Sequence, residues 1–504
     1  MLLGNAIPIP FTRNNSGAAI DVDSLILEVN TALSGQTSSN QFKIQIQTFG
    51  VTSNYNVDWG DGNTDENVTT DITHTYSSPG VYDIKISEDF AGTQYSFGDA
   101  QKITQIKQWG TIPYKRLQDA FRGARNLEIT ATDIPNLTNL DSQGLQGTFR
   151  QCFAMTNSNG SLVNWDTSTV ANFNACFYGC EVFNQPIPQN WDFSNVGDNG
   201  ISFLFYECYA LDQDVSQMNV NWSNITNLTA PFGKAGRNTT PKYNICNYDI
   251  SNWDVSNVVS MTGFSTGQSQ EETSLSDKQP LSIGMDQWDL SGLSNYSPAN
   301  YANFQLLFCN MKENTNGVGC SWSDIVTGWS SYINPTNVDK LSYQSMFRGS
   351  TFNEDLSSWD LSNGVRFNGM FERARSYNQP LSGWNLSSIA SQSFDFGGSY
   401  VSMFRDADSF DQSLGDLNIG APQSSVWNSM LDAVLRNESI STANYDATLV
   451  AWNNQINALP SAQRPTGCLV NMGSSTYTLG SAADTARTNL ISTYSWSFTD
   501  GGGV

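Results

Sequence analysis

Residues 346–363 read Met-Phe-Arg-Gly-Ser-Thr-Phe-Asn-Glu-Asp-Leu-Ser-Ser-Trp-Asp-Leu-Ser-Asn. The pattern returns in residues 370–387 and, shortened, in residues 403–414. Earlier copies begin at Phe121, Phe149, Phe177, Phe205, Phe232 and Phe308, and the first five lie 28, 28, 28 and 27 residues apart. A unit of this length cannot bury its apolar side alone, so its copies must stack. The repeat predicts a solenoid of about a dozen coils over residues 99–437, with about 4.8 Å per coil.

The third residue after each repeat Phe is small. It is a cysteine at Cys152, Cys180 and Cys208, where other copies have alanine or serine. This pattern is typical of buried thiols that pack as small apolar groups, so we expect core thiols. The alternative is oxidation between neighbouring coils. Asn and Gln after the second aromatic, as at Asn353 and Asn378, are placed to form amide ladders between copies.

The composition limits the partners of the chain. Lys plus Arg is 24 and Asp plus Glu is 47, so the net charge is 24 − 47 = −23. A polyanion repels nucleic-acid phosphates and anionic lipid head groups, so we expect no nucleic acid partner. The longest apolar runs are shorter than the ~18 residues that span a bilayer, which predicts no membrane insertion. His74 is the single histidine, which argues against a zinc cluster or a Ser-His-Asp triad.

Residues 41–98 show the alternation of half-buried strands. They contain Val57-Asp58-Trp59-Gly60-Asp61-Gly62, His74-Thr75-Tyr76 and Pro79-Gly80-Val81-Tyr82. This set resembles the polycystic-kidney-disease (PKD) type of immunoglobulin-like domain. The resemblance implies a small β-sandwich that serves as a spacer or adhesion module, with His74 in a structural role. Residues 1–40 are predicted to form an N-terminal arm or a first strand.

The repeat vocabulary, such as Phe183-Asn184-Gln185-Pro186 and Trp253-Asp254-Val255-Ser256-Asn257-Val258, resembles the BspA-like leucine-rich-repeat group, the "26-residue repeat surface proteins". The resemblance covers most of residues 117–435. It implies a mainly β chain with a leucine-rich-repeat-like solenoid, short helices and a non-enzymatic surface-binding role. Residues 102–110 resemble the opening cap of that group, and residues 438–504 resemble its C-terminal cap.

The first candidate binding residues follow the repeat Phe directly: Arg122, Arg150, Tyr178, Tyr206, Arg348 and Arg405. Stacking of the copies would align them into a ladder. Arg and Tyr favour recognition surfaces, and aromatic platforms suit sugars. The alternative interpretation is that each Arg binds the free carbonyls at the end of a short helix.

The second candidates lie in insertions between copies, which map to loops on one face of repeat proteins. The loop 233–243 is locally positive and contains Lys234, Arg237, Lys242 and Tyr243. The long stretch between Trp288 and Phe347 contains Trp322 and Trp329. Ordinary drift in loop length is the alternative explanation.

Catalytic chemistry has little support in the sequence. Asp58 and Asp61 form a carboxylate pair within the PKD-like motif, and Ca²⁺ binding there is unsupported by a dense run of ligands. The sequence lacks the flanked carboxylate pair typical of a glycosidase and any Gly-rich phosphate loop. We therefore expect no enzyme activity and no cofactor.

The expected function is binding through an extended surface. The first residues have no basic stretch, and Pro8 and Pro10 interrupt them, so a signal peptide is not indicated. A virion protein needs no signal peptide, because it leaves the cell by particle assembly and lysis. This favours a phage virion component (fibre, spike or capsid-surface protein) on the virion surface. It would contact a host-surface glycan or protein, and residues 1–40 would bind other virion structural proteins. The alternatives are a secreted, extracellular adhesin of a bacterial cell surface and a glycan-active enzyme.

Overall fold

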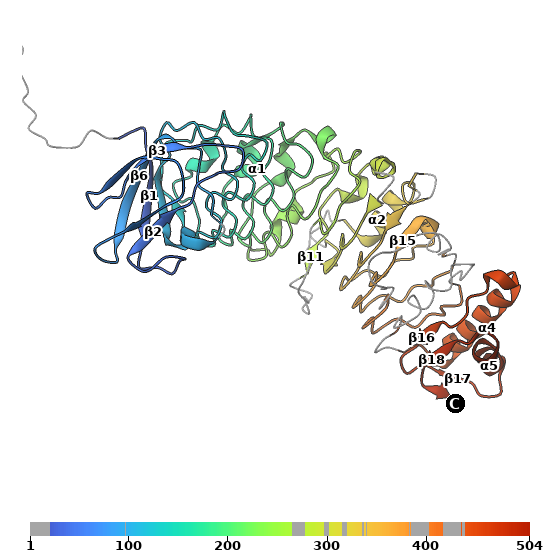
Figure 1. Ribbon diagram of the computed structural model, residues 1–504. Coiled ribbons are helices and arrows are strands. Elements are labelled where there is room, and N and C mark those ends of the chain that lie inside the picture. Colours follow the sequence, from blue (N-terminus) through green and yellow to red (C-terminus); the bar gives the residue numbers. More distant parts are fainter. Residues whose placement is uncertain are drawn as a thin grey trace, which may run out of the picture.

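The computed structural model describes residues 21–95, 97–264, 278–296, 302–314, 320–334, 337–338, 340–382, 384, 403–416, 435 and 439–504 (Figure 1). This part of the chain is mainly β, with few helices. The molecule is elongated. Strands gather at its N-terminal end, and helices α4 (Thr442–Ala458) and α5 (Ala482–Tyr494) lie at its C-terminal end.

The N-terminal region contains two sheets. In spatial order, the larger sheet has β4 (Thr64–Val68), β3 (Asn54–Asp58), β6 (Val81–Asp89), β1 (Leu25–Asn30), β7 (Ile103–Gln108) and β8 (Glu128–Ile129). The smaller sheet pairs β2 (Gln41–Ile44) with β5 (Ile72–Thr75). Their inward side chains belong to one hydrophobic cluster.

The strand β1 corrects the boundaries expected from the sequence. Its alternate residues Leu25, Leu27 and Val29 are buried, and the strand pairs antiparallel with both β6 and β7. The sheet therefore crosses the boundaries expected at residues 40 and 98. The reason is that an apolar strand needs hydrogen-bonding partners on both edges when it is buried. Residues 1–20 of the expected arm lie outside the described residues.

A stack of aromatic rings fills the smaller sheet's side of this core. The His74 ring stacks on Trp59 at 4.8 Å and meets the edge of Tyr76 at 4.6 Å. His74 Nε2 lies 2.9 Å from a carboxylate oxygen of Asp61. Trp59 and Tyr76 are buried, whereas Tyr82 is half-buried against Tyr76. These contacts indicate that His74 packs in the core of this region.

A buried ion pair holds the loop before β2. Lys102 and Asp99 are both fully buried, with Nζ 3.8 Å from a carboxylate oxygen. The Lys102 ammonium donates hydrogen bonds to the carbonyl oxygens of Thr37, Ser38 and Gln41 at 3.1, 2.7 and 2.8 Å. Burial lowers the pKa of Lys102, although the charge of Asp99 opposes this shift.

The copies of the repeat lie side by side in register. The N–H of most repeat Phe residues donates to the carbonyl oxygen of the residue that precedes the Phe of the next copy, as in Phe121 to Thr148 (2.9 Å), Phe149 to Cys176 (3.0 Å) and Phe371 to Met403 (2.9 Å). The Phe rings stack with centroid distances of 5.5 to 6.1 Å from Phe121 to Phe205. The repeat period therefore places the same residue types next to one another.

Regular elements in the repeat region are short. The strands are β9 (Asp192–Phe193), β10 (Asn219–Val220), β11 (Gln279–Pro280), β12 (Ala302–Asn303), β13 (Met311–Lys312), β14 (Leu341–Ser342) and β15 (Gly364–Arg366), and they pair in parallel. The α-helices are α1 (Ile187–Asn190) and α2 (Trp322–Trp329). Short 3-10 helices span Gly98–Lys102, Ser161–Asn164, Val215–Gln217, Trp222–Asn224, Asn244–Asn247, Met285–Gln287, Ser291–Asn295, Leu361–Asn363 and Ser461–Gln463.

The polar and sulfur groups of the repeat also connect neighbouring copies. The thiols of Cys152, Cys180 and Cys208 donate to the carbonyl oxygens of Phe121, Phe149 and Phe177, each one copy earlier, at 3.3, 3.1 and 3.0 Å. All eight cysteines are buried and free. The Asn353 side-chain oxygen accepts from the Asn378 N–H at 2.8 Å, and Asn378 accepts from Asp411 at 2.9 Å. Core thiols and an amide ladder are therefore present.

The C-terminal region ends the array with helices and two pairs of parallel strands: β16 (Leu469–Asn471) with β18 (Ser497–Thr499), and β17 (Thr476–Tyr477) with β19 (Gly502–Gly503). The buried Asp500 carboxylate accepts from Tyr445 at 2.6 Å and from Arg487 at 2.9 Å. This network connects the two helices to the last strands.

Candidate functional site

The residue after each repeat Phe occupies the same place in successive copies, because the backbone bonds repeat. The N–H two residues after each Phe donates to the carbonyl oxygen of that residue in the next copy: Gly123 to Arg150 at 2.8 Å, Gln151 to Tyr178 at 2.6 Å and Gly179 to Tyr206 at 2.7 Å. The alignment expected from the sequence is therefore present.

These residues pack in two groups, Arg122 on Phe97 and then Arg150, Tyr178, Tyr206 and Lys234 in sequence. We call the set Phe97, Arg122, Arg150, Tyr178, Tyr206 and Lys234 the cation–aromatic ladder. The Arg122 guanidinium lies 5.5 Å from the Phe97 ring centroid, and the Arg150 guanidinium lies 4.5 Å from that of Tyr178. The rings of Tyr178 and Tyr206 stack at 4.7 Å, and Lys234 Nζ lies 5.8 Å from the Tyr206 ring centroid.

This stacking changes what the ladder offers to a ligand. Arg150 covers one face of Tyr178, and Tyr206 packs against the ring as well. Tyr206 is itself buried between Tyr178 and Lys234. The rings therefore do not form the open platform for sugars that the sequence suggested. The ladder offers the edges of its guanidinium groups and rings instead.

Two carboxylates lie beside the ladder. A carboxylate oxygen of Asp119 is 3.7 Å from Arg122, and Glu207 is 3.1 Å from Lys234. Burial raises the pKa of Asp119 above its ordinary value, against the lowering effect of the charges on Arg122 and Arg150. Asp119 therefore lies close enough to both guanidinium groups for their charges to act on it.

The two ladder arginines have unused hydrogen-bond donors. An arginine side chain has five N–H donors. Among the described residues, neither Arg122 nor Arg150 donates a side-chain hydrogen bond to a protein acceptor, and the Nε of each is buried without a partner. By contrast, Arg487 donates from two nitrogens to Asp500. Stacking, rather than hydrogen bonding, thus holds the two ladder guanidinium groups.

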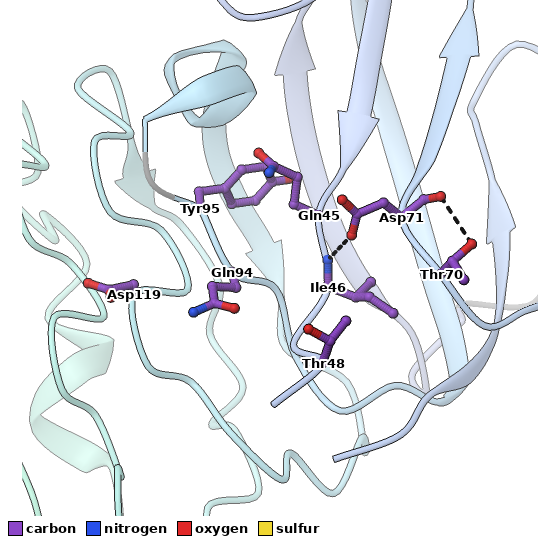
Figure 2. Close-up of a pocket in the computed structure, with 8 residues that line it drawn as sticks. All are labelled: Gln45, Ile46, Thr48, Thr70, Asp71, Gln94, Tyr95 and Asp119. Carbon is purple, nitrogen blue, oxygen red and sulfur yellow. Dashed lines mark hydrogen bonds between the residues drawn. The ribbon is translucent and has the colours of Figure 1, made fainter. Parts of the chain in front are cut away.

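A pocket lies where the N-terminal sheets meet the first copies of the repeat (Figure 2). It has a volume of about 480 Å³, and its polar lining includes Gln45, Thr48, Asp71 and Gln94. Asp119 also lines it and so belongs to both the pocket and the margin of the ladder. The Gln45 side-chain oxygen is buried without a partner among the described residues.

The later copies carry a different arrangement at the ladder position. Arg348 and Arg405 flank Glu372, which lies 3.3 Å from Arg348 Nε and 3.8 Å from Arg405 Nη1. Arg405 also lies 3.5 Å from Asp406. Carboxylates thus neutralise the guanidinium groups here, and these two predicted residues form a structural charge network separate from the cation–aromatic ladder.

Three predicted binding residues belong to the core instead. Trp322 and Trp329 lie in α2 with exposed fractions of 1% and 0%, and their indole N–H groups donate to Thr351 and Met285. Tyr243 is also buried, at 2%. The expectation of a surface role for these aromatics is wrong. For the two tryptophans the reason is that the long insertion folds into a helix whose apolar face is buried. In the same loop as Tyr243, Arg237 is half-buried and Lys242 is exposed.

Sequence reasoning missed Phe97 and Asp119. Phe97 precedes the first recognisable copy, so the repeat motif does not mark it. Asp119 lies two residues before Phe121, at a position that is glycine or alanine in the next two copies, Gly147 and Ala175. A carboxylate at a position that is otherwise small could have indicated a special role for Asp119.

The carboxylates of Asp58 and Asp61 have protein partners. Asp58 accepts a hydrogen bond from the Gly60 N–H at 2.9 Å, and Asp61 accepts from Asn63 at 3.0 Å and contacts His74. Within the described ranges, no group of three or more His, Cys, Asp or Glu side chains is placed to hold a metal ion.

None of the helices in the described part of the chain is long and apolar enough to cross a membrane.

Comparison with known proteins identifies one family. The family described as "Mycoplasma protein of unknown function, DUF285" matches residues 117–245, 238–298 and 309–443, which together make up more than half of the chain. Searches of the curated proteins and of the solved structures returned no match. The matched segments contain the stacked copies of the repeat and all but one of the residues of the cation–aromatic ladder. The chain therefore belongs to the DUF285 family.

Proposed function

We propose that this protein is a non-enzymatic binding protein whose repeat region contacts a glycan or protein on the surface of a host cell. The cation–aromatic ladder carries the proposal. It repeats one position over neighbouring copies and places two half-buried guanidinium groups, which donate no side-chain hydrogen bond to the described protein, in a protein with net charge −23. Arg and Tyr are the residue types that favour recognition surfaces.

The finer architecture belongs to the same proposal. We propose a leucine-rich-repeat-like solenoid, supported by the parallel bonds and the stacked Phe rings. Before it lies a PKD-like sandwich, supported by the packing of Trp59, His74 and Tyr76. The sandwich would act as a spacer, and the solenoid would present a long surface for contact.

A binding assay on cells tests the function. Fluorescently labelled full-length chain is titrated onto washed cells of the source culture, and bound fluorescence is measured. We expect saturable binding that unlabelled chain displaces. A triple variant, Arg122→Gln with Arg150→Gln and Lys234→Gln, should bind more weakly, whereas Arg375→Gln, outside the ladder, should not. Absence of saturable binding would overturn the proposed function.

The setting within this proposal is a phage virion, with a bacterial cell surface as the alternative. Mass spectrometry of purified particles and of washed cell envelopes from the source culture separates them. Recovery of this chain with the particles supports a virion component. Recovery with the envelopes alone supports a cell-surface adhesin.

A further inference from the structure

We infer that Arg122 and Arg150 bind the carboxylate of an acidic sugar, with the sugar hydroxyls turned towards the polar pocket that Asp119 also lines. This inference rests on the proposed function and names the class of ligand that the ladder takes.

The charge arrangement favours an anion. Arg122 and Arg150 occupy equivalent positions in adjacent copies, and both act on the single carboxylate of Asp119. Two like charges on adjacent copies repel each other, and an anion placed between them offsets that repulsion. Asp119 is 3.7 Å from Arg122, and no side-chain hydrogen bond joins it to either guanidinium. A ligand carboxylate would therefore supply the charge-assisted hydrogen bonds that Asp119 does not make.

The donor geometry favours a carboxylate. The Arg122 side chain is 24% exposed, and its guanidinium packs against a ring, as that of Arg150 does. A guanidinium held over an aromatic ring keeps its N–H groups in the plane of its edge. That planar fork matches a planar carboxylate. Lys234, at the far end of the ladder, is already paired with Glu207, so the two arginines are the natural anchor.

The pocket favours a sugar over a simple anion. Its polar lining presents the amides of Gln45 and Gln94 and the hydroxyl of Thr48, which are groups that hydrogen-bond to hydroxyls. Figure 2 shows Asp119 and Gln94 on the side of the pocket that faces the repeat region. A single carboxylated sugar adds one negative charge, which a strongly acidic protein tolerates better than a polyanion.

Calorimetry on the full-length chain tests the inference. The probes are digalacturonate and sialyllactose, each compared with its carboxyl-reduced form. We expect the carboxylated form of at least one probe to bind about 10-fold to 100-fold more tightly, the size of lost charge-assisted hydrogen bonds. The arm that responds distinguishes uronic from sialic acids. Equal affinity of both forms for both probes would overturn the inference.

Variants assign the effect to the two arginines. Arg122→Gln and Arg150→Gln should each abolish the preference for the carboxylated form, and Arg150→Lys should restore part of it. Asp119→Asn should increase the affinity, because it removes the competing carboxylate. Arg125→Gln is the matched control, since its guanidinium also lies over a ring, Phe153 at 5.3 Å, outside the ladder. Retention of the preference in both Gln variants, with unchanged thermal unfolding, would contradict the assignment. Saturable binding to cells without any carboxylate preference would leave the proposed function standing and remove this inference.

Discussion

The indole N–H of Trp191 donates a hydrogen bond to the carbonyl oxygen of Leu162, one copy earlier in the repeat, over 2.7 Å. Equivalent bonds join Trp288 to Ile250, Trp329 to Met285, Trp359 to Val326, Trp452 to Leu414 and Trp496 to Pro465. In these copies tryptophan does more than fill the core, because its indole N–H bonds to the backbone of an earlier segment.

Trp191 and Trp165 form a matched pair for measuring this bond. Their rings stack at 5.6 Å and both are buried, but the Trp165 Nε1 has no partner among the described residues. We expect Trp191→Phe to lower the free energy of unfolding by about 1 kcal/mol more than Trp165→Phe, because only the first change leaves an acceptor with a lost bond. Denaturant titration followed by circular dichroism measures both. Equal losses would show that the indole bond contributes nothing.

The cysteines should be unreactive in the folded protein. Burial raises the pKa of Cys246 to about 11 and those of Cys309 and Cys468 to about 12. The thiolate is the reactive species, so little is present near pH 8. Iodoacetamide followed by mass spectrometry should label none of the cysteines in the native chain and all eight after denaturation. Rapid native labelling of Cys152, Cys180 or Cys208 would contradict the buried packing.

Removal of the buried ammonium of Lys102 should destabilise the N-terminal region strongly. Lys102→Met would leave Asp99 buried without its counter-ion, which typically costs about 3–5 kcal/mol. The control is Lys115→Met, whose partner Asp89 is half-exposed, and we expect a loss of ~1 kcal/mol or less. Hydrogen exchange of the strands β1 and β6 reports both effects. Similar protection from exchange in Lys102→Met and Lys115→Met would contradict the larger role of the buried ion pair.

Replacing Gln151 with glycine should stabilise the copy that begins at Phe149. Gln151 has a φ of 63°, whereas the equivalent residues Gly123 and Gly179 have the glycine that this left-handed backbone favours. The Gln151 side-chain oxygen is also buried without a partner among the described residues. We expect Gln151→Gly to stabilise the chain by about 1 kcal/mol, measured as a higher midpoint of thermal unfolding. Gly179→Ala should lower that midpoint.

Asp119 should make stability depend on pH. Because its pKa is raised in the folded state, the folded chain holds this proton more tightly than the unfolded chain. The contribution to stability is therefore full below about pH 3.8 and is lost as the pH rises through the raised pKa. Asp119→Asn removes this loss and suits the φ of 51° at this position. The variant should unfold at a higher temperature than the natural chain at about pH 7, and the gap should close near pH 4. A constant gap would indicate a cause other than titration.

Much of the fold follows from local pattern. The period of the repeat Phe, the small residue three places later and the Asn at the second aromatic predict which side chains meet across copies. The stacked Phe121 and Phe149, the thiol of Cys180 and the amide of Asn353 lie accordingly. The alignment of Arg122, Arg150 and Tyr178 follows for the same reason: one hydrogen-bond register repeated by one period brings equivalent residues together.

Contacts between segments distant in sequence decided the rest. Trp322 and Trp329 lie in a long insertion between copies, which suggested an exposed binding loop. Only the packing of α2 shows that both belong to the core. Alignment predicted that Tyr178 and Tyr206 lie together, but not that their stacking would cover the ring faces. Phe97 belongs to the ladder and Asp119 lies beside it, and the repeat motif marks neither residue. A repeated sequence determines which residues are neighbours, whereas burial and charge depend on every group that packs around them.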